Sequence, residues 1–162
     1  MYSHHPVSRR ERVAGLLTSA IAEARLQASI GSSLELLVHR TVDEHLANVR
    51  SGAVAFSVVE ICAGTGPAHV SAVRMLRSQF PSVPVLAYCD SLPGLSRLIL
   101  DVARAGVTGL LIRDLDDSPH LLRDALRQAR HAAIGERVYR QLVPYVRPDA
   151  QSFLRYAVDH TG

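Results

Sequence analysis

The sequence predicts a single α/β domain built on a parallel β-sheet. Its 162 residues are enough for one hydrophobic core plus a small appendage. Hydrophobic residues make up 48% of the chain and charged residues 20%, the balance of a folded globular protein. Short apolar runs alternate with amphipathic stretches, which indicates that β-strands and α-helices take turns along the chain. We therefore expect five consecutive βα units, a (βα)5 doubly wound sheet of five parallel strands.

The first two βα units are bounded by capping signals. Residues 13–18 form the first predicted strand, and residues 19–30 form a helix that Gly31 can end in a left-handed conformation. Residues 34–38 are the second strand. Thr41 opens the second helix, because it begins a sequence with the spacing of a capping box.

The next two units surround the longest apolar run. Residues 53–62 form a buried strand, residues 63–67 a loop of small residues, and residues 68–79 a helix with one apolar face. Residues 83–89 are the fourth strand. The helix that follows carries apolar residues at helical spacing and stops at Gly106.

The fifth unit is followed by a helical tail. Residues 107–112 are the fifth strand, and Ser118 before Pro119 has the pattern of a helix N-cap. The tail has no strand signal and contains one short amphipathic helix after Pro144 and Pro148. The predicted organisation is a flexible arm at 1–11, the domain at 12–134, and a linker plus the start of a truncated helical output domain at 135–162.

Composition and charge exclude several functional classes. All 18 basic residues are Arg, so lysine-dependent catalysis is excluded. The net charge of +3 is small and the arginines are scattered, which permits nucleic-acid binding without indicating it. No apolar run reaches the roughly 18 residues of a membrane span, and the first residues lack the apolar region of a signal peptide. We expect a cytoplasmic protein without a membrane partner, in which Cys62 and Cys89 are reduced, buried thiols.

Two segments resemble the receiver domain of two-component response regulators. Residues 103–127, ARAGVTGLLIRDLDDSPHLLRDALR, are similar to the receiver segment from the end of the fourth helix into the fifth helix. Arg113 stands where receivers carry a Lys. Residues 80–86 resemble the receiver entry into the fourth strand. The similarity covers about residues 12–132 and implies a flavodoxin-like fold.

The resemblance also implies a degenerate phosphorylation pocket. Receivers are phosphorylated on an Asp at the end of the third strand, beside an acidic pair that helps to hold Mg²⁺. Here Glu60 lies at the phosphoacceptor position, Thr18 and Ser19 replace the acidic pair, Cys89 replaces a Ser or Thr, and Arg113 replaces the Lys. One carboxylate beside two hydroxyls is a poor magnesium site. We therefore expect an atypical receiver, or pseudo-receiver, that is not an enzyme and has no cofactor or metal.

The pair of Glu60 and Arg113 has two interpretations. A carboxylate lengthened by one methylene and facing a permanent guanidinium charge can imitate phospho-aspartate paired with lysine. Alternatively, it is a structural ion pair in a pocket that has lost its function. Either version predicts that function depends on surfaces rather than turnover.

In receivers, the face formed by the fourth helix, fifth strand and fifth helix commonly mediates homodimerisation. The candidate residues for such a face are Arg97, Asp101, Arg104, Arg123 and Arg127. The tail resembles the linker and first helix of a helix-turn-helix output domain, but it lacks the second, recognition helix that enters the major groove. We expect a homodimeric signalling module of a bacterial transcription regulator, with DNA contacted only through an output domain missing or truncated in this chain.

Two alternatives remain open. Residues 59–66 look like the first motif of S-adenosylmethionine-dependent methyltransferases, with Gly64 and Gly66 near the cofactor and Asp90 as the ribose ligand. Against this interpretation, Cys62 stands where that motif has a Gly, and the family's sheet has seven strands. The second alternative is a stand-alone partner-binding pseudo-receiver. The eight histidines form no ligand-spaced group, so we expect no zinc site.

Overall fold

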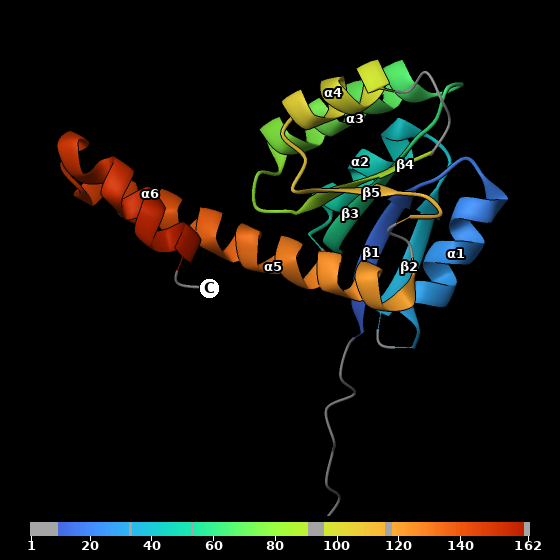
Figure 1. Ribbon diagram of the computed structural model, residues 1–162, viewed down its shortest axis with the longest axis horizontal. Coiled ribbons are helices and arrows are strands. Elements are labelled where there is room, and N and C mark those ends of the chain that lie inside the picture. The colour runs from blue at the N-terminus through green and yellow to red at the C-terminus, as the bar shows by residue number, and fades with distance from the viewer. Residues whose placement is uncertain (1–9, 33, 53, 91–95, 116–117, 161–162) are drawn as a thin grey trace, which may run out of the picture.

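Figure 1 shows the computed structural model of the chain, which describes residues 10–32, 34–52, 54–90, 96–115 and 118–160. Within these residues, five parallel strands form one sheet in the order β2-β1-β3-β4-β5. The strands are β1 (Glu11–Leu16), β2 (Leu34–His39), β3 (Val54–Ile61), β4 (Val85–Cys89) and β5 (Gly109–Ile112). The predicted five-stranded parallel sheet is confirmed.

Helices cover both faces of the sheet, as in other doubly wound folds. They are α1 (Ala20–Ile30), α2 (Val42–Arg50), α3 (Gly66–Gln79), α4 (Ser96–Arg104) and α5 (Pro119–Leu142). Helices α2, α3 and α4 share one core with Val59 and Ile61, whereas α1 and α5 share the other with Val58. Successive residues of a strand point to opposite faces, so β3 supplies both cores and its sequence is almost continuously apolar.

Capping hydrogen bonds and one backbone angle at the helix ends confirm three of the predicted boundaries. The Ser19 hydroxyl accepts hydrogen bonds from two amides of the first turn of α1. Thr41 caps α2 by accepting from the amide of Glu44 at 3.3 Å. Gly31 follows α1 with φ of +66°, a conformation that residues with a side chain rarely adopt.

Other boundaries differ from the prediction by a few residues. The sequence predicts the first strand at 13–18, whereas β1 begins at Glu11 and the chain leaves the sheet before Thr18. Helix α3 begins at Gly66 instead of residue 68, because Pro67 fits the first turn of a helix. Some predicted features lie wholly or partly outside the described residues: the arm at 1–11, the strand start at Ala53 and the turn at 90–94.

The fifth helix is longer than the sequence predicts. A linker is expected from Gly135, but α5 continues through this residue to Leu142 and has 24 residues. A Cβ atom at Gly135 would lie 3.2 Å from Val158 Cγ1 of α6 (Gln151–His160). This glycine therefore serves the close approach of two helices instead of ending one. The predicted start of the linker at 135 is wrong.

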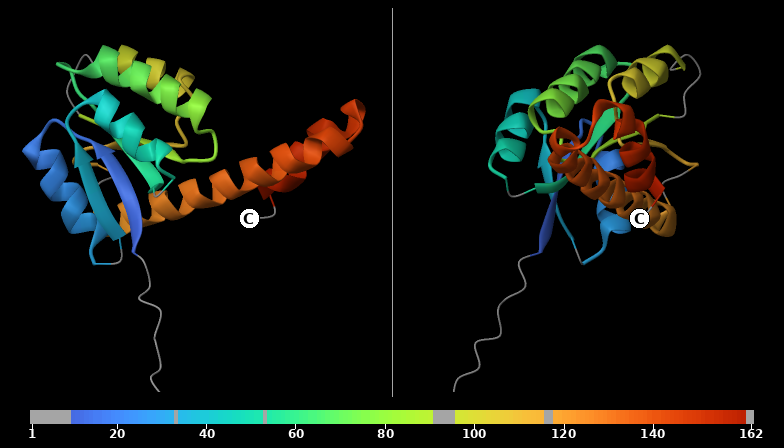
Figure 2. Two further views of the ribbon diagram at one scale, coloured as in Figure 1. Left: turned by 180° about the vertical axis from the view of Figure 1, so that it is seen from behind. Right: turned by 90° about the vertical axis from the view of Figure 1, so that its left-hand side faces the viewer.

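Beyond α5 the chain turns back on itself. Short 3-10 turns at Val143–Tyr145 and Pro148–Ala150 confirm the break expected around Pro144 and Pro148. Helix α6 then lies along the outer part of α5, and the two project from the domain as a helical hairpin (Figure 1, Figure 2). Each helix in the described residues is too short or too polar to cross a membrane.

Candidate functional site

The candidate site lies at the carboxyl ends of β1 and β3. The chain passes from β1 to β2 on one side and then crosses to β3 on the other side of β1. Such a switch point opens a crevice at the carboxyl edge of the sheet, which is the usual ligand site of doubly wound folds. Glu60, near the end of β3, meets Thr18 and Ser19, which follow β1.

Four hydrogen bonds converge on the carboxylate of Glu60. Its Oε2 atom accepts from the Thr18 amide at 2.6 Å, from the Thr18 hydroxyl at 2.9 Å and from the Ser19 amide at 3.0 Å. Its Oε1 atom accepts from Arg113 Nη2 at 2.9 Å. Glu60 is only 1% exposed. Because Ser19 is the N-cap of α1, the carboxylate also lies at the positive end of that helix dipole.

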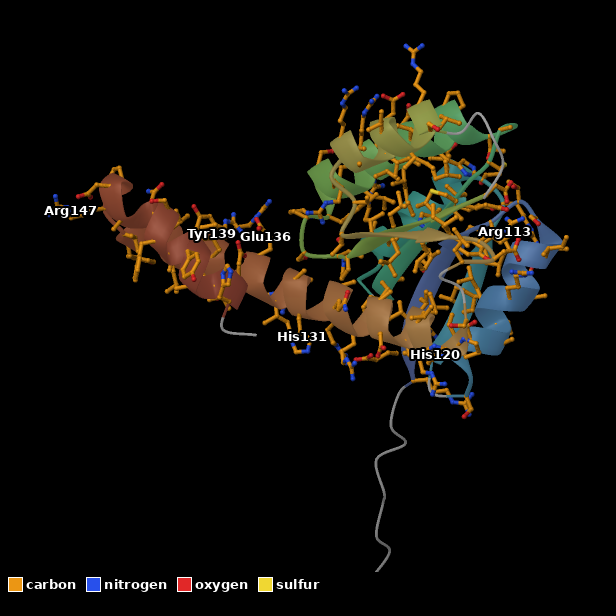
Figure 3. The ribbon with its side chains drawn as sticks, in the orientation of Figure 1. Arg113, His120, His131, Glu136, Tyr139 and Arg147 are labelled. Carbon is orange, nitrogen blue, oxygen red and sulfur yellow. The ribbon has the colours of Figure 1, made fainter. Side chains whose placement is uncertain are left out.

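Arg113, which follows β5, joins Glu60 to a second carboxylate. Its Nη1 atom lies 2.7 Å from Asp90 Oδ1, at the end of β4. Its Cζ atom lies 5.4 Å from the centroid of the Tyr88 ring. Figure 3 places Arg113 at the edge of the sheet beside α1. A guanidinium suits this position because its planar fork donates hydrogen bonds in two directions at once.

The neighbours of Glu60 keep it ionised. Burial alone would raise the pKa of Glu60, because a buried charge loses its hydration. The hydrogen bonds from Ser19 and Thr18, together with the positive charge of Arg113, outweigh burial and hold the pKa of Glu60 below its usual value. Burial likewise opposes the charge of Arg113, but Asp90 and other neighbours raise the pKa of that guanidinium. The site is therefore a closed cluster in which the Arg113 guanidinium lies between two carboxylates.

These residues do not fit a magnesium ion, the metal that the receiver resemblance implies. Mg²⁺ requires hard oxygen ligands in near-octahedral geometry. Both oxygens of Glu60 already accept hydrogen bonds, and the Ser19 hydroxyl accepts from two amides of α1. Asp90 is bound by Arg113, which adds a permanent positive charge. Among the described residues, no group of three His, Cys, Asp or Glu side chains is arranged to hold a metal.

The structure brings together four of the five predicted pocket residues, namely Thr18, Ser19, Glu60 and Arg113. Cys89 does not join them. Its side chain belongs to the core on the α2, α3 and α4 face, where its strand neighbour is Ile61. Burial, with a smaller effect from the Asp90 charge, raises the pKa of the Cys89 thiol to about 11. This thiol is a core residue.

The predicted cofactor glycines have a structural explanation. A Cβ atom at Gly66 would lie 2.5 Å from Leu98 Cδ1, so this glycine allows α3 and α4 to pack closely. Gly64 has no atom within 4 Å of the position of a Cβ. Asp90, the predicted ribose ligand, is bound to Arg113. Together with the five-stranded sheet, these contacts do not favour the methyltransferase alternative.

The residues predicted for a dimer face lie on α4 and α5. Arg104 is 3.9 Å from Asp101 within α4, and Arg127 is 2.7 Å from a carboxylate one turn away on α5. Arg97 and Arg123 are exposed on the same two helices. Exposed ion pairs within one helix contribute little to stability and exchange partners readily. The face is accessible, and the homodimer stays a prediction.

The sequence analysis does not predict the contact between buried His45 and partly buried His39. His45 of α2 is fully buried; its Nε2 atom is 2.7 Å from the Ser57 hydroxyl, and its Nδ1 atom is 3.2 Å from His39 Nδ1. Burial, with His39 and His69 nearby, lowers the pKa of His45 to about 3, so the ring is neutral. The sequence clue is Ser57, a polar residue inside an apolar strand. These contacts hold α2 on the sheet.

No protein-family model and no curated protein matches the chain. Solved structures do resemble it. TadZ, a CheY-like protein from Pseudomonas aeruginosa PAO1, has a TM-score of 0.64 and 20% identity, covering 74% of this chain and 99% of that one. The signal receiver domain of an HD domain-containing protein from Pseudomonas fluorescens Pf-5 has a TM-score of 0.66 and 22% identity, covering 84% and 98%. The chain has the receiver fold.

A larger protein contains the same fold as one part. NtrX from Brucella abortus, solved with ADP, has a TM-score of 0.66 and 13% identity, covering 83% of this chain but 29% of its own. These likenesses confirm the predicted flavodoxin-like receiver fold. Within that fold, Glu60 lies near the end of β3 and Arg113 directly follows β5, where the resemblance implies the phosphoacceptor and the Lys.

Proposed function

We propose that the chain is an atypical receiver, a pseudo-receiver that acts as a non-catalytic signalling and dimerisation module of a bacterial transcription regulator in the cytoplasm. The observation that carries this proposal is the closed site, in which four hydrogen bonds, one of them from Arg113, bind the carboxylate of Glu60. Burial shields this carboxylate from a phosphoryl donor, and the hydrogen bonds and the ion pair make its oxygens weaker nucleophiles. The neighbouring acid, Asp90, is bound by Arg113 and so is not free to share a metal with Glu60.

In this proposal the ion pair imitates the phosphorylated state. Glu60 carries its negative charge one methylene further from the backbone than an Asp, and Arg113 binds it as a Lys would bind phospho-aspartate. Arg113 also binds Asp90, so one cation connects the ends of β3, β4 and β5. If the ion pair is only structural, replacing Glu60 should change the stability of the fold alone. If the pair imitates the phosphorylated state, replacing Glu60 should change partner binding as well.

A ligand test examines the closed site. A ligand that binds only the folded chain raises its melting temperature in proportion to the logarithm of ligand concentration. We expect no change in melting temperature with Mg²⁺ and beryllofluoride, and no added mass after incubation with acetyl phosphate and Mg²⁺. A saturable rise, or a gain in mass that matches one phosphoryl group, would overturn the proposal. A dose-dependent rise with S-adenosylmethionine would restore the methyltransferase alternative.

A second test addresses the partner. The proposal assigns dimerisation to α4, β5 and α5, and DNA binding to an output domain instead of the described helices. Sedimentation velocity over a range of concentrations should show a dimer that Arg104→Glu and Arg127→Glu weaken. The matched control is Arg74→Glu, which makes the same charge change on exposed α3. A monomer at every concentration would favour the stand-alone partner-binding pseudo-receiver.

A further inference from the structure

The outer part of α5 presents an apolar stripe that no described residue covers. It consists of Ile134, Val138 and Leu142, which are 51%, 38% and 44% exposed. These residues are spaced by four, so they follow one side of the helix beyond the sheet. Helix α6 covers a different side of α5, where Arg155 lies 2.8 Å from Glu136. Figure 3 shows Glu136 on the part of α5 next to α6.

At its inner end the stripe meets a groove between α5 and the domain. The groove has a volume of about 430 Å³ and lies against the amino ends of β3 and β4. Its lining includes the apolar residues Val54, Phe56, Val83, Pro84 and Ile134. Its volume lies within the range of about 300–1,000 Å³ typical of pockets that hold ligands. The groove and the stripe adjoin each other, because Ile134 belongs to both.

The charges along this surface are positive. Arg130 and Arg137 line the groove, and among the described residues no Asp or Glu does so. Arg130 pairs with Glu11 of β1. Arg137 is exposed and makes no ion pair with any residue that the structure describes. The apolar groove is thus flanked by an uncompensated positive charge.

This charge pattern indicates which kind of partner can bind to the groove and the stripe. In a two-fold interface each patch meets its own copy, so a second copy of this chain would bring the Arg137 of both copies, unpaired among the described residues, into one interface. A partner with carboxylates beside its apolar residues removes that repulsion and supplies the charge that Arg137 lacks. From Ile134 to Leu142 the stripe rises by eight steps of 1.5 Å, about 12 Å, which matches two turns of a partner helix.

We propose that the groove and stripe bind an acidic amphipathic helix of a partner protein. The apolar face of that helix, with residues at i, i+4 and i+7, inserts a large side chain into the groove and packs along Ile134 and Val138. Its acidic flank faces Arg137. The surface lies at the amino ends of the strands, at the opposite edge of the sheet from Glu60, and the proposal does not depend on the chemistry of that site.

The test uses a fluorescein-labelled helical peptide with Leu at i, i+4, i+7 and i+11, Glu at the flanking positions and Ala elsewhere. Fluorescence anisotropy with the full chain should show saturable binding that weakens as salt increases. The variants Arg137→Glu and Ile134→Ser should each weaken binding about tenfold or more, which corresponds to about 1.4 kcal/mol. Arg74→Glu on α3 is the matched control and should bind like the wild type.

Several results would overturn this proposal. Affinity weaker than about 1 mM, or equal affinity of the wild type and both groove variants, would show that the surface does not bind such a helix. Equal binding of a peptide with Lys in place of Glu would remove the charge argument. A concentration-dependent dimer that Ile134→Ser abolishes would assign the surface to a second copy. Circular dichroism and thermal melts of each variant show that it is folded before its affinity is interpreted.

Discussion

Replacing Glu60 by Gln perturbs the closed site most directly. The amide keeps the shape of the carboxylate but loses its charge, and its NH₂ group must face donors from either Thr18 or Arg113. Removing one partner of a buried ion pair costs about 3–5 kcal/mol when the other partner is left alone. Arg113 keeps Asp90 at 2.7 Å, so the cost is smaller. We expect Glu60→Gln to lower the free energy of unfolding by about 2–3 kcal/mol at pH 7.

Urea unfolding followed by circular dichroism measures this loss, and its pH dependence identifies the cause. The pKa of Glu60 in the folded chain is below its usual value of 4.5, so the unfolded chain takes up the proton first as the pH falls. The stabilisation by the charge is present above pH 4.5 and is lost as the pH falls through the folded pKa. The difference in stability between the wild type and Glu60→Gln should therefore shrink below pH 4.5.

The matched control is Glu35→Gln on β2. Glu35 pairs with Arg12 at 2.9 Å, but its side chain is 45% exposed. Exposed pairs contribute only about 0–1 kcal/mol. Equal losses in the two variants, or a loss in Glu60→Gln that does not change with pH, would refute the argument that a buried charge holds the site together.

Three further predictions address packing and ionisation. Gly66→Ala should lower the free energy of unfolding by about 1–3 kcal/mol, because its Cβ would lie 2.5 Å from a side chain of α4. Gly64→Ala should be neutral, because that site is open. Equal melting temperatures of the two variants would contradict this explanation. The free energy of unfolding should decrease as the pH is lowered from 6.5 to about 3. Over this range His45 binds a proton in the unfolded chain but stays neutral in the folded chain, where its pKa is about 3. A His45→Gln variant should lose that part of the pH slope in urea titrations, and an unchanged slope would assign it to other groups. A thiol reagent should modify Cys62, which is partly exposed, in the native chain. It should modify Cys89, which is buried and has a pKa raised to about 11, only after unfolding. Equally fast reaction of both thiols would contradict the burial argument.

The sheet was predictable because its signals are local. Alternating apolar and amphipathic runs place strands and helices, and residues such as Thr41 and Gly31 mark helix ends through hydrogen bonds and backbone angles of their own neighbourhood. The candidate site was predicted only through resemblance to receivers, because Glu60 and Arg113 are far apart in sequence and no spacing rule connects them. In the structure, Arg113 Nη2 lies 2.9 Å from Glu60 Oε1.

The sequence predictions are wrong where contacts between residues far apart in the sequence determine the local structure. At the end of β4, neighbouring residues point to opposite faces, so one position separates the core residue Cys89 from the site residue Asp90. Sequence alone places Cys89 in the pocket and gives Asp90 a different role. Gly135 is a helix-ending residue by local rules, yet it lies inside α5 because Val158 packs against it from a helix later in the chain.

The two versions of the Glu60 and Arg113 pair differ in what a partner would detect. A ligand shifts a protein between states only if it binds one of them better. Glu60 is ionised and fully hydrogen-bonded, so the closed site is a constant feature of the chain at neutral pH. A partner that changes the state of the chain must then bind at a surface outside the closed site. Helix α5 connects the closed site with the groove, because its 24 residues, about 36 Å long, begin soon after Arg113 and reach the groove.

Binding at two coupled sites is reciprocal, so a perturbation at Glu60 reports on this connection. If the ion pair imitates a phosphorylated state, opening it with Glu60→Gln should change the affinity of the acidic peptide for the groove, by about fivefold or more for a typical coupling. If the pair is only structural, the folded variant should bind the peptide with the affinity of the wild type. Anisotropy titrations at pH 7, well below the melting temperature of the variant, separate the two cases. An unchanged affinity would refute the mimic while leaving the groove proposal intact, because that proposal depends on Arg137 and Ile134.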